Sequence, residues 1–360
     1  MTRDGVLRER VRSRVAEVPP YVPGLGGAQG HGKLSSNEAP FGASPRVRQA
    51  LRALPDVVHR YDSGLRTREL LAAALGVSAA EVLLTNGSDE LCYLIGLLLL
   101  DGGGRSVVLS EPSYAIDTKV SAIFGARARF VPLRDGGHDL PRLAAAAADA
   151  DLVWLPTPHN PTGVAVPPAD LVAFVEAVPP DCLVVVDEAY RAFLSPDLVP
   201  DTVALVRRHP NVLVQRTFSK DHALAGLRAG YGVASAEVVS ALDALRGPFN
   251  VNAAALVAVE ASLDSEAWRA LGVDLVQRER RLLEEFLSTQ DIAYYPSQAN
   301  FVAVRVPYAE IAEALGRAGL FVRPGEDLGL PGWCRLSIGE PAHMAALRRV
   351  LAGWRAADGR

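Results

Sequence analysis

The sequence predicts an α/β protein with a mostly parallel β-sheet that helices cover on both faces, and a smaller α/β second domain. Short, uniformly apolar segments such as 107–109 and 183–186 alternate with helical segments along the first two thirds of the chain. Strands that lack a polar face are typical of a sheet buried on both sides. After residue 252 the pattern changes to long charged helices, and 360 residues exceed the usual size of one domain core.

Each expected element rests on a local pattern. Short apolar runs predict strands at 82–84, 107–109, 128–133, 152–155, 183–186, 212–214, 301–304 and 335–338, and a short strand that runs into a turn within 33–42. Helical patterns are found at 45–54, 65–75, 90–100, 114–124, 143–150, 171–177, 253–287 and 342–354. The run 19–27, PPYVPGLGG, discourages both helix and sheet. We therefore expect an N-terminal arm (1–30) that joins the small domain, a large domain (31–252) and a small C-terminal domain (253–360).

Composition excludes several classes of protein. The chain is 49% hydrophobic and 22% charged with a net charge of −4, which describes a globular protein and gives no basic surface for nucleic acid. The longest apolar run, 91–100, is too short to cross a membrane, and the N-terminus lacks the apolar core of a secretory signal. The three cysteines are far apart and show no metal or disulfide spacing. We therefore expect a cytoplasmic protein without a metal site.

The stretch 217–232, TFSKDHALAGLRAGYG, carries the strongest chemical pattern. It follows the apolar run 212–214 and places Lys220 between hydroxyl side chains and Arg228. A lysine at a strand end, beside an arginine and hydroxyls that bind anions, suits a Schiff-base lysine next to a phosphate, since desolvation and nearby cations help an amine to lose its proton. Taken alone, Lys220 and Arg228 could equally be ordinary surface charges.

Other strand ends carry polar residues that fit the same site. The stretch Gly87-Ser88-Asp89 opens a helix, where backbone N–H groups favour a phosphate, although it is also a good helix cap. Asn160 lies in a loop stiffened by three prolines. Asp187 ends a buried strand, where an acid needs a partner such as a cationic ring nitrogen. A magnesium site of the Walker type is the alternative, but the matching glycine-rich loop with its lysine is absent.

Taken together, these motifs resemble the fold-type I pyridoxal-phosphate aminotransferases, and within them the histidinol-phosphate aminotransferases. The matching stretches, in chain order, are PYVPG (20–24), KLSSNEAPFG (33–42), RYDSG (60–64), NGSDEL (86–91), EPSYAID (111–117), PHNPTG (158–163), VVVDEAY (184–190), RTFSK (216–220), LAGLRAGY (224–231), PFNVN (248–252), YPSQANF (295–301), FVRP (321–324) and CRLSIG (334–339). They cover nearly the whole chain in the order of that family.

The resemblance implies a role for each matching residue. Lys220 would bind the cofactor, pyridoxal 5'-phosphate, and move the proton during transfer, while Asp187 would pair with the pyridinium nitrogen so that the ring accepts electrons. Asn160 and Tyr190 would hydrogen-bond the phenolic oxygen, and Tyr114 would stack on the ring. The residues implied at the phosphate are Gly87, Ser88, Asp89, Thr217, Ser219 and Arg228. Planar guanidinium groups suit phosphate oxygens.

The resemblance also implies a homodimer and a substrate site. Tyr61 would reach the phosphate bound by the neighbouring subunit. Arg323 and Arg335 would face the substrate, with Tyr21 and Asn37 at the mouth of the pocket. Arginine binds either a carboxylate or a phosphate through a bidentate pair. The implied reaction therefore moves an amino group from L-histidinol phosphate to 2-oxoglutarate, and gives imidazole-acetol phosphate and glutamate.

Departures from the family pattern leave alternatives open. The proline that usually follows the tyrosine is replaced at Asp62, His159 stands where asparagine is common, and His222 and Pro324 are also unusual. His159 could contact groups around the cofactor or lie on the surface. An aminotransferase for aromatic or other amino acids, including one of specialised metabolism, and a related decarboxylase remain alternatives. A dehydrogenase is disfavoured because no GxGxxG motif follows an early strand. A non-catalytic regulator is disfavoured because the cofactor-site residues are present.

Overall fold

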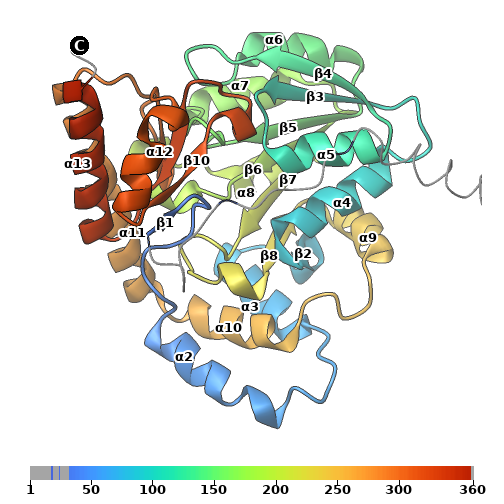
Figure 1. The fold of residues 1–360 in the computed structure, drawn as a ribbon. Coiled ribbons are helices and arrows are strands. Elements are labelled where there is room, and N and C mark those ends of the chain that lie inside the picture. Colours follow the sequence, from blue (N-terminus) through green and yellow to red (C-terminus); the bar gives the residue numbers. More distant parts are fainter. Residues whose placement is uncertain (1–17, 19–23, 25–31, 358–360) are drawn as a thin grey trace, which may run out of the picture.

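The computed structural model describes residues 18, 24 and 32–357 and contains two β-sheets (Figure 1). A seven-stranded sheet has the order β2-β8-β7-β6-β5-β3-β4, and a four-stranded sheet has the order β1-β10-β11-β9. The strands of the larger sheet are β2 (Val82–Thr85), β3 (Ser106–Glu111), β4 (Arg127–Pro132), β5 (Leu152–Pro156), β6 (Leu183–Asp187), β7 (Val212–Thr217) and β8 (Gly230–Val233). Those of the smaller sheet are β1 (Lys33–Leu34), β9 (Phe301–Val304), β10 (Phe321–Pro324) and β11 (Cys334–Ser337).

The larger sheet is mostly parallel, and the predicted α/β fold is confirmed. Strands β4, β3, β5, β6 and β7 pair in parallel, whereas β8 is antiparallel to both β7 and β2. Strand β8 was not predicted, because glycines weaken a strand pattern. Gly230 allows β8 to lie close to the start of α4, since a Cβ at this position would lie 2.6 Å from the backbone nitrogen of Ser88.

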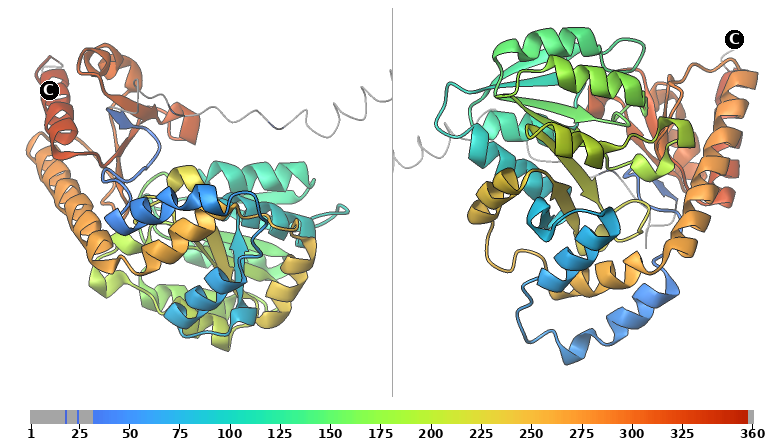
Figure 2. Two further views of the ribbon diagram at one scale, coloured as in Figure 1. Left: turned by 90° about the horizontal axis from the view of Figure 1, so that it is seen from below. Right: turned by 180° about the vertical axis from the view of Figure 1, so that it is seen from behind.

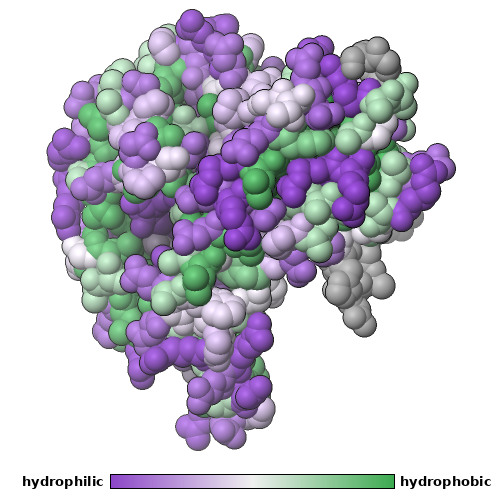
Figure 3. Space-filling view, turned by 90° about the vertical axis from the view of Figure 1, so that its left-hand side faces the viewer, coloured by the Kyte–Doolittle hydropathy of each residue, from purple (hydrophilic) through white to green (hydrophobic). Residues whose placement is uncertain are grey.

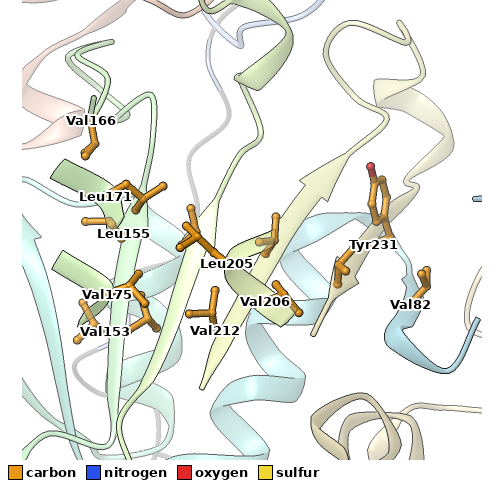
Figure 4. Packing of buried hydrophobic residues seen from close by; sticks show 14 of the residues in the cluster. Val82, Val153, Leu155, Val166, Leu171, Val175, Leu205, Val206, Val212 and Tyr231 are labelled. Atoms are coloured by element: carbon orange, nitrogen blue, oxygen red, sulfur yellow. The ribbon is translucent and has the colours of Figure 1, made fainter. Parts of the chain in front are cut away.

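Helices cover both faces of this sheet, as its apolar strands predict (Figures 1 and 2). Alternate residues of β6 belong to different cores: Val184 and Val186 pack with α3, α6, α7, α8 and α10, whereas Leu183 and Val185 pack with α4, α5 and α9. Figure 4 shows part of the first cluster. The helices are α2 (Pro45–Arg52), α3 (Leu65–Leu75), α4 (Gly87–Leu99), α5 (Ala115–Ile123), α6 (Leu140–Ala146), α7 (Pro168–Ala177), α8 (Thr202–Arg208), α9 (Ala236–Leu245), α10 (Ala253–Leu263), α11 (Glu266–Thr289), α12 (Tyr308–Arg317) and α13 (Pro341–Ala357).

The smaller sheet has its own apolar core. Side chains of β9, β10 and β11 pack there with Leu34 of β1 and with α11, α12 and α13. Helix α11, 24 residues long, runs along the side of the molecule (Figure 2). The helical stretch expected at 253–287 is divided into α10 and α11 at residues 264–265, a position that the pattern did not indicate. The Ser265 hydroxyl lies 2.8 Å from that of Ser44, a tertiary contact that the local pattern does not reveal.

The division of the chain at residues 30 and 252 stays a prediction. Strand β1 lies within the range expected for the large domain, yet it pairs with β10 in the smaller sheet. Apart from residues 18 and 24, the expected arm 1–30, with Tyr21, lies outside the described residues. Within the described ranges, no helix combines the length and apolar character needed to span a membrane. Hydrophilic and hydrophobic residues are interspersed on the side that carries α13 (Figure 3).

Candidate active site

A cavity of about 320 Å³ lies at the carboxyl ends of the parallel strands. Ligands bind at this edge of open α/β sheets, because the loops that follow parallel strands meet there. The predicted cofactor residues that line the cavity are Ser88, Asp89, Tyr114, Asn160, Asp187, Tyr190, Thr217, Ser219, Lys220 and Arg228. Residues separated by more than a hundred positions in the sequence therefore share one cavity, as the motifs predicted.

Lys220 follows β7 directly, and its amine is surrounded by protein. Burial lowers the pKa of Lys220 to about 8, and the nearby positive charge of Arg335 contributes to this shift. Its Nζ lies 5.5 Å from the centre of the Tyr190 ring. An amine with this pKa is partly neutral near pH 7.5, which a Schiff-base lysine requires.

A cradle of donors lies at the start of α4. Gly87 has a φ of +75°, and a Cβ there would fall 2.6 Å from a guanidinium nitrogen of Arg228, so the position depends on glycine. Arg228 Nη1 donates to the Ser219 hydroxyl at 3.4 Å, and Thr217 Oγ1 lies 3.0 Å from the same hydroxyl. Backbone N–H groups at a helix start, hydroxyls and a guanidinium together match the oxygens of a phosphate.

Asp89 joins two of the predicted residues. Its carboxylate accepts from the Tyr114 hydroxyl at 3.2 Å and from Arg228 Nη2 at 3.4 Å. Burial raises the pKa of Tyr114, and the negative charge of Asp89 acts in the same direction, so the phenol keeps its proton and remains a donor. Asp89 thus fixes the ring of Tyr114 at the cavity wall.

Asp187 is the last residue of β6 and is buried. Its Oδ1 accepts from the backbone N–H of Ala189 at 2.9 Å, and its Oδ2 accepts from Nε2 of Gln215 at 3.1 Å. Burial raises the pKa of Asp187 to about 6, and the two hydrogen bonds oppose that rise. Gln215 was not singled out from the sequence. It comes immediately after the apolar run of β7, and only the register between β6 and β7 places it next to Asp187. The sequence alone therefore could not assign it to the site.

Tyr190 receives two amide groups at its hydroxyl. Asn37 Nδ2 lies 3.0 Å away and Asn160 Nδ2 lies 3.4 Å away. Arg335 Nη1 donates to Asn160 Oδ1 at 2.7 Å, and Ser337 Oγ donates to Asn37 Oδ1 at 2.8 Å. Both amides are therefore held in one orientation by residues of β11. Asn37 and Arg335 do not line the cavity but contact residues that do.

Arg323 and Arg335 lie opposite one another on β10 and β11. Both side chains are buried, so neither is an exposed strand-end charge, and β11 is an internal strand. Arg323 Nε lies 3.3 Å from Asp327 Oδ2, which supplies an acid four residues after the arginine. Neither arginine lines the cavity, but Arg335 bonds the lining residue Asn160, so its positive charge lies beside the cavity, whereas Arg323 is paired with Asp327.

Three predicted or unusual residues lie away from the cavity lining. Tyr61 is 85% exposed and stacks on Phe249, with ring centres 4.7 Å apart. His159 is buried; its Nε2 lies 3.1 Å from the carbonyl oxygen of Pro112, and burial lowers its pKa. His222 is held 2.6 Å from the hydroxyl of Ser262, and burial lowers its pKa to about 4. Both histidines are therefore neutral groups that brace loops.

No group of three or more His, Cys, Asp and Glu side chains within the described ranges could hold a metal ion. The donor set instead fits pyridoxal phosphate. An amine, an acid for a ring nitrogen and an anion cradle whose glycine leaves room for Arg228 are combined in one cavity. These are the three groups that this cofactor requires.

Comparison with known proteins agrees with this geometry. The family model described as aminotransferase class I and II matches residues 32–351. The chain is 40% identical to histidinol-phosphate aminotransferase 1 of Thiobacillus denitrificans, over 99% of this chain and 97% of that protein. It is 43% identical to the histidinol-phosphate aminotransferase of Symbiobacterium thermophilum, over 92% and 94%. The crystal structure of the Sinorhizobium meliloti histidinol-phosphate aminotransferase in complex with pyridoxal-5'-phosphate has a TM-score of 0.84 at 30% identity, over 91% of each chain. The chain therefore belongs to the class I and II aminotransferases.

Proposed function

We propose that this protein is a pyridoxal-phosphate-dependent aminotransferase that moves an amino group between L-histidinol phosphate and 2-oxoglutarate, and gives imidazole-acetol phosphate and glutamate. The observation that carries the proposal is the single cavity in which Lys220, Asp187 and Arg228 meet beside two buried arginines. The named relatives, which match this chain over nearly its full length, support the choice of substrate.

The cofactor residues have separate tasks. Gly87, Ser88, Thr217, Ser219 and Arg228 would hold the phosphate group. The cofactor supplies an electron-accepting ring that stabilises negative charge at the substrate Cα.

Other residues of the cavity lining would hold the ring. Asp187 would accept the N–H of the pyridine ring, and Tyr190 and Asn160 would hydrogen-bond its phenolic oxygen. Tyr114 would cover one face, because Asp89 fixes its hydroxyl at 3.2 Å.

Lys220 would act as the acid and base. Its pKa of about 8 would allow the amine to take the proton from the substrate Cα. The same amine would then return the proton to the carbon on the other side of the transferred nitrogen. His159 and His222 do not line the cavity, and burial lowers the pKa of each, so neither competes for this task.

Arg335 and Arg323 would bind the anionic ends of the substrates. Both substrates of the proposed pair carry anions, a phosphate in one case and carboxylates in the other, and a guanidinium donates to either anion in a bidentate pair. Arg335 is already oriented by its bond to Asn160, so little freedom is lost when substrate binds. Tyr21 would complete the mouth of the pocket together with Asn37.

A second subunit would complete the site. We place the dimer interface at the exposed Tyr61 and Phe249 pair, next to a cavity of about 250 Å³ lined in part by Asp62 and Leu65. An 85% exposed tyrosine stacked on a partly exposed phenylalanine is an apolar surface suited to a partner. The proposal includes a cytoplasmic enzyme with the division into arm (1–30), large domain (31–252) and small domain (253–360).

A single-turnover experiment tests the substrate. Protein loaded with pyridoxal phosphate is mixed separately with L-histidinol phosphate, glutamate and phenylalanine, and the cofactor absorbance is followed. Histidinol phosphate should convert the cofactor to its amine form, glutamate should do so as the second donor, and the Lys220→Ala variant should convert neither. If another amine converts the cofactor while histidinol phosphate leaves it unchanged, the substrate assignment is wrong. Release of carbon dioxide would identify a decarboxylase.

A further inference from the structure

Gln215 has a fully buried side chain beside the acid of the active site. It lies directly opposite Asp187 in the pairing of β6 with β7, and its Nε2 donates to Asp187 Oδ2 at 3.1 Å. The other carboxylate oxygen accepts from the Ala189 backbone N–H at 2.9 Å. Each carboxylate oxygen thus accepts one hydrogen bond from the protein, and these bonds fix the plane of the carboxylate relative to the cavity that it lines.

The Gln215 amide is itself held in one orientation. Cys92 Sγ lies 3.4 Å from Gln215 Oε1, and both side chains are fully buried. Burial raises the pKa of Cys92 well above its usual value, so the thiol keeps its proton and acts as the donor. Because the thiol donates to the oxygen of the amide, the NH₂ group must face Asp187. Cys92 belongs to α4, the helix whose start forms the anion cradle.

The electrostatic surroundings make this amide important. Besides the neutral amide of Gln215, the ionisable groups that influence Asp187 or share its surroundings are Asp89, Asp117, Cys92, Tyr114, Tyr190 and Lys220. Burial raises the pKa of Asp117, which favours the neutral form of this second acid. Lys220 favours the charged form of Asp187, and Asp89 opposes it. A neutral donor that bonds the carboxylate favours its charged form without adding a competing ion.

We propose that Gln215, held by Cys92, is a positioning residue that directs the Asp187 carboxylate at the ring nitrogen of pyridoxal phosphate and keeps it charged there. This inference rests on the proposed cofactor site. It adds to that site two residues that do not line the cavity, Gln215 of β7 and Cys92 of α4. It predicts that loss of the amide changes the protonation of the bound ring, and does not merely loosen the core.

The test compares Gln215→Leu with the control Val214→Ala. Val214 lies on the same strand, but its side chain packs into the core on the other face of the sheet, so this variant loses buried volume without losing the amide. Pyridoxal phosphate labelled with ¹⁵N at the ring provides a direct reading of ring protonation by NMR. We expect Gln215→Leu to weaken cofactor binding about tenfold, as for a lost hydrogen bond to a charged group, and to move the ring ¹⁵N shift toward neutral pyridine. Val214→Ala should leave that shift at the wild-type value.

Cys92 provides a second pair of variants. Cys92→Ser keeps a donor for the amide and should retain the wild-type shift, whereas Cys92→Ala should move it partway toward that of Gln215→Leu. If Gln215→Leu does not fold, Gln215→Met, which is unbranched and of similar length, takes its place. An unchanged shift and affinity in the folded Gln215 variant would overturn the inference. Failure of the wild-type protein to bind the cofactor would instead overturn the proposed function.

Discussion

The side-chain amide of Asn37 donates to the Tyr190 hydroxyl at 3.0 Å across 153 positions of sequence. Asn37 follows β1 of the smaller sheet and is tied to that sheet by Ser337, whose hydroxyl accepts from its backbone N–H at 2.8 Å. Tyr190 follows β6 of the larger sheet. This pair therefore joins the two sheets at the wall of the candidate active site.

Asn37 also adopts a left-handed backbone conformation, with a φ of 53°. Replacing Asn37 by alanine or by glycine removes its side-chain bonds to Tyr190 and Ser337. Alanine keeps a Cβ at positive φ without the local polar contacts that ease this conformation for asparagine, whereas glycine adopts it without strain. We expect Asn37→Ala to be less stable than Asn37→Gly by about 1 kcal/mol in urea unfolding, and both variants to lose turnover. Equal stability of the two variants would show that the backbone conformation carries no strain.

Replacing Asp187 by asparagine should stabilise the apoprotein while it abolishes activity. The pKa of Asp187 rises from 3.8 to about 6 on folding, which corresponds to roughly 3 kcal/mol. Between these pH values the folded protein keeps a proton on Asp187 that the unfolded chain has lost. The destabilisation caused by the buried charge is therefore fully present above pH 6 and disappears below about pH 3.8. Because asparagine disturbs the bond with Gln215, we expect a net gain of about 1–3 kcal/mol at pH 7.

Urea unfolding of the apoprotein at several pH values checks this expectation. The difference between Asp187→Asn and wild type should shrink as the pH falls from 6 toward 4. Asp197→Asn, at an exposed acid outside the cavity, provides the control and should show no such trend. A difference that stays constant with pH would mean that the burial of charge is not its source.

Much of this site was predicted from sequence, for a physical reason. Lys220, Asp187 and Asn160 each follow an apolar run, and the ends of parallel strands meet at one edge of a sheet. Their placement in one cavity is therefore fixed by local pattern and topology. The two arginines on adjacent strands were expected for the same family pattern, but their direct opposition depends on the register between β10 and β11.

The parts that were missed depend on contacts between distant segments. Strand β8 contains two glycines, one of which allows the start of α4 to approach closely. The position of the break between α10 and α11 coincides with a contact between Ser265 and Ser44. Gln215 gains its meaning only from the pairing of β6 with β7. Such contacts leave no periodic pattern in the sequence.

The reactivity of Lys220 should follow a pKa near 8. The neutral amine reacts, so the rate at which the apoprotein takes up pyridoxal phosphate should rise with pH through about 8, well below the 10.5 of an ordinary lysine. Stopped-flow absorbance measures this rate, normalised to the rate of a simple amine with the same cofactor. Arg335→Leu removes a positive charge that lowers the pKa, so the midpoint should move upward. An unchanged midpoint would exclude that charge as a cause.

Arg335→Lys should damage substrate binding more than cofactor binding. Lysine keeps the charge but cannot form the bidentate pair, nor bond Asn160 and the Ser35 carbonyl together as Arg335 does at 2.7 and 2.9 Å. We expect KM for 2-oxoglutarate to rise about 10- to 100-fold, which corresponds to one lost charged hydrogen bond, with little change in cofactor affinity. Arg305→Lys, at an exposed position, is the control for the chemical change. A normal KM would remove Arg335 from the substrate site.

Tyr61 should act on the neighbouring subunit. The side chain is 85% exposed and does not line the cavity of its own chain, so a role at the cofactor phosphate requires a partner. We expect Tyr61→Phe and Lys220→Ala each to bind or use the cofactor poorly when prepared alone. A mixed dimer of the two variants contains one site that combines an intact Lys220 with an intact Tyr61 from the other subunit.

Refolding the two variants together should therefore restore activity at about a quarter of the wild-type level, because half of the dimers are mixed and each mixed dimer has one complete site. The same mixture made from Lys220→Ala and Asp187→Ala should remain inactive, because Lys220 and Asp187 line one cavity in one chain and no mixed dimer contains both. If Tyr61 served its own subunit, the first mixture would have no complete site and would stay at the level of the Tyr61→Phe sites alone. The comparison thus separates a tyrosine that crosses the interface from one that merely stabilises its own loop through Phe249.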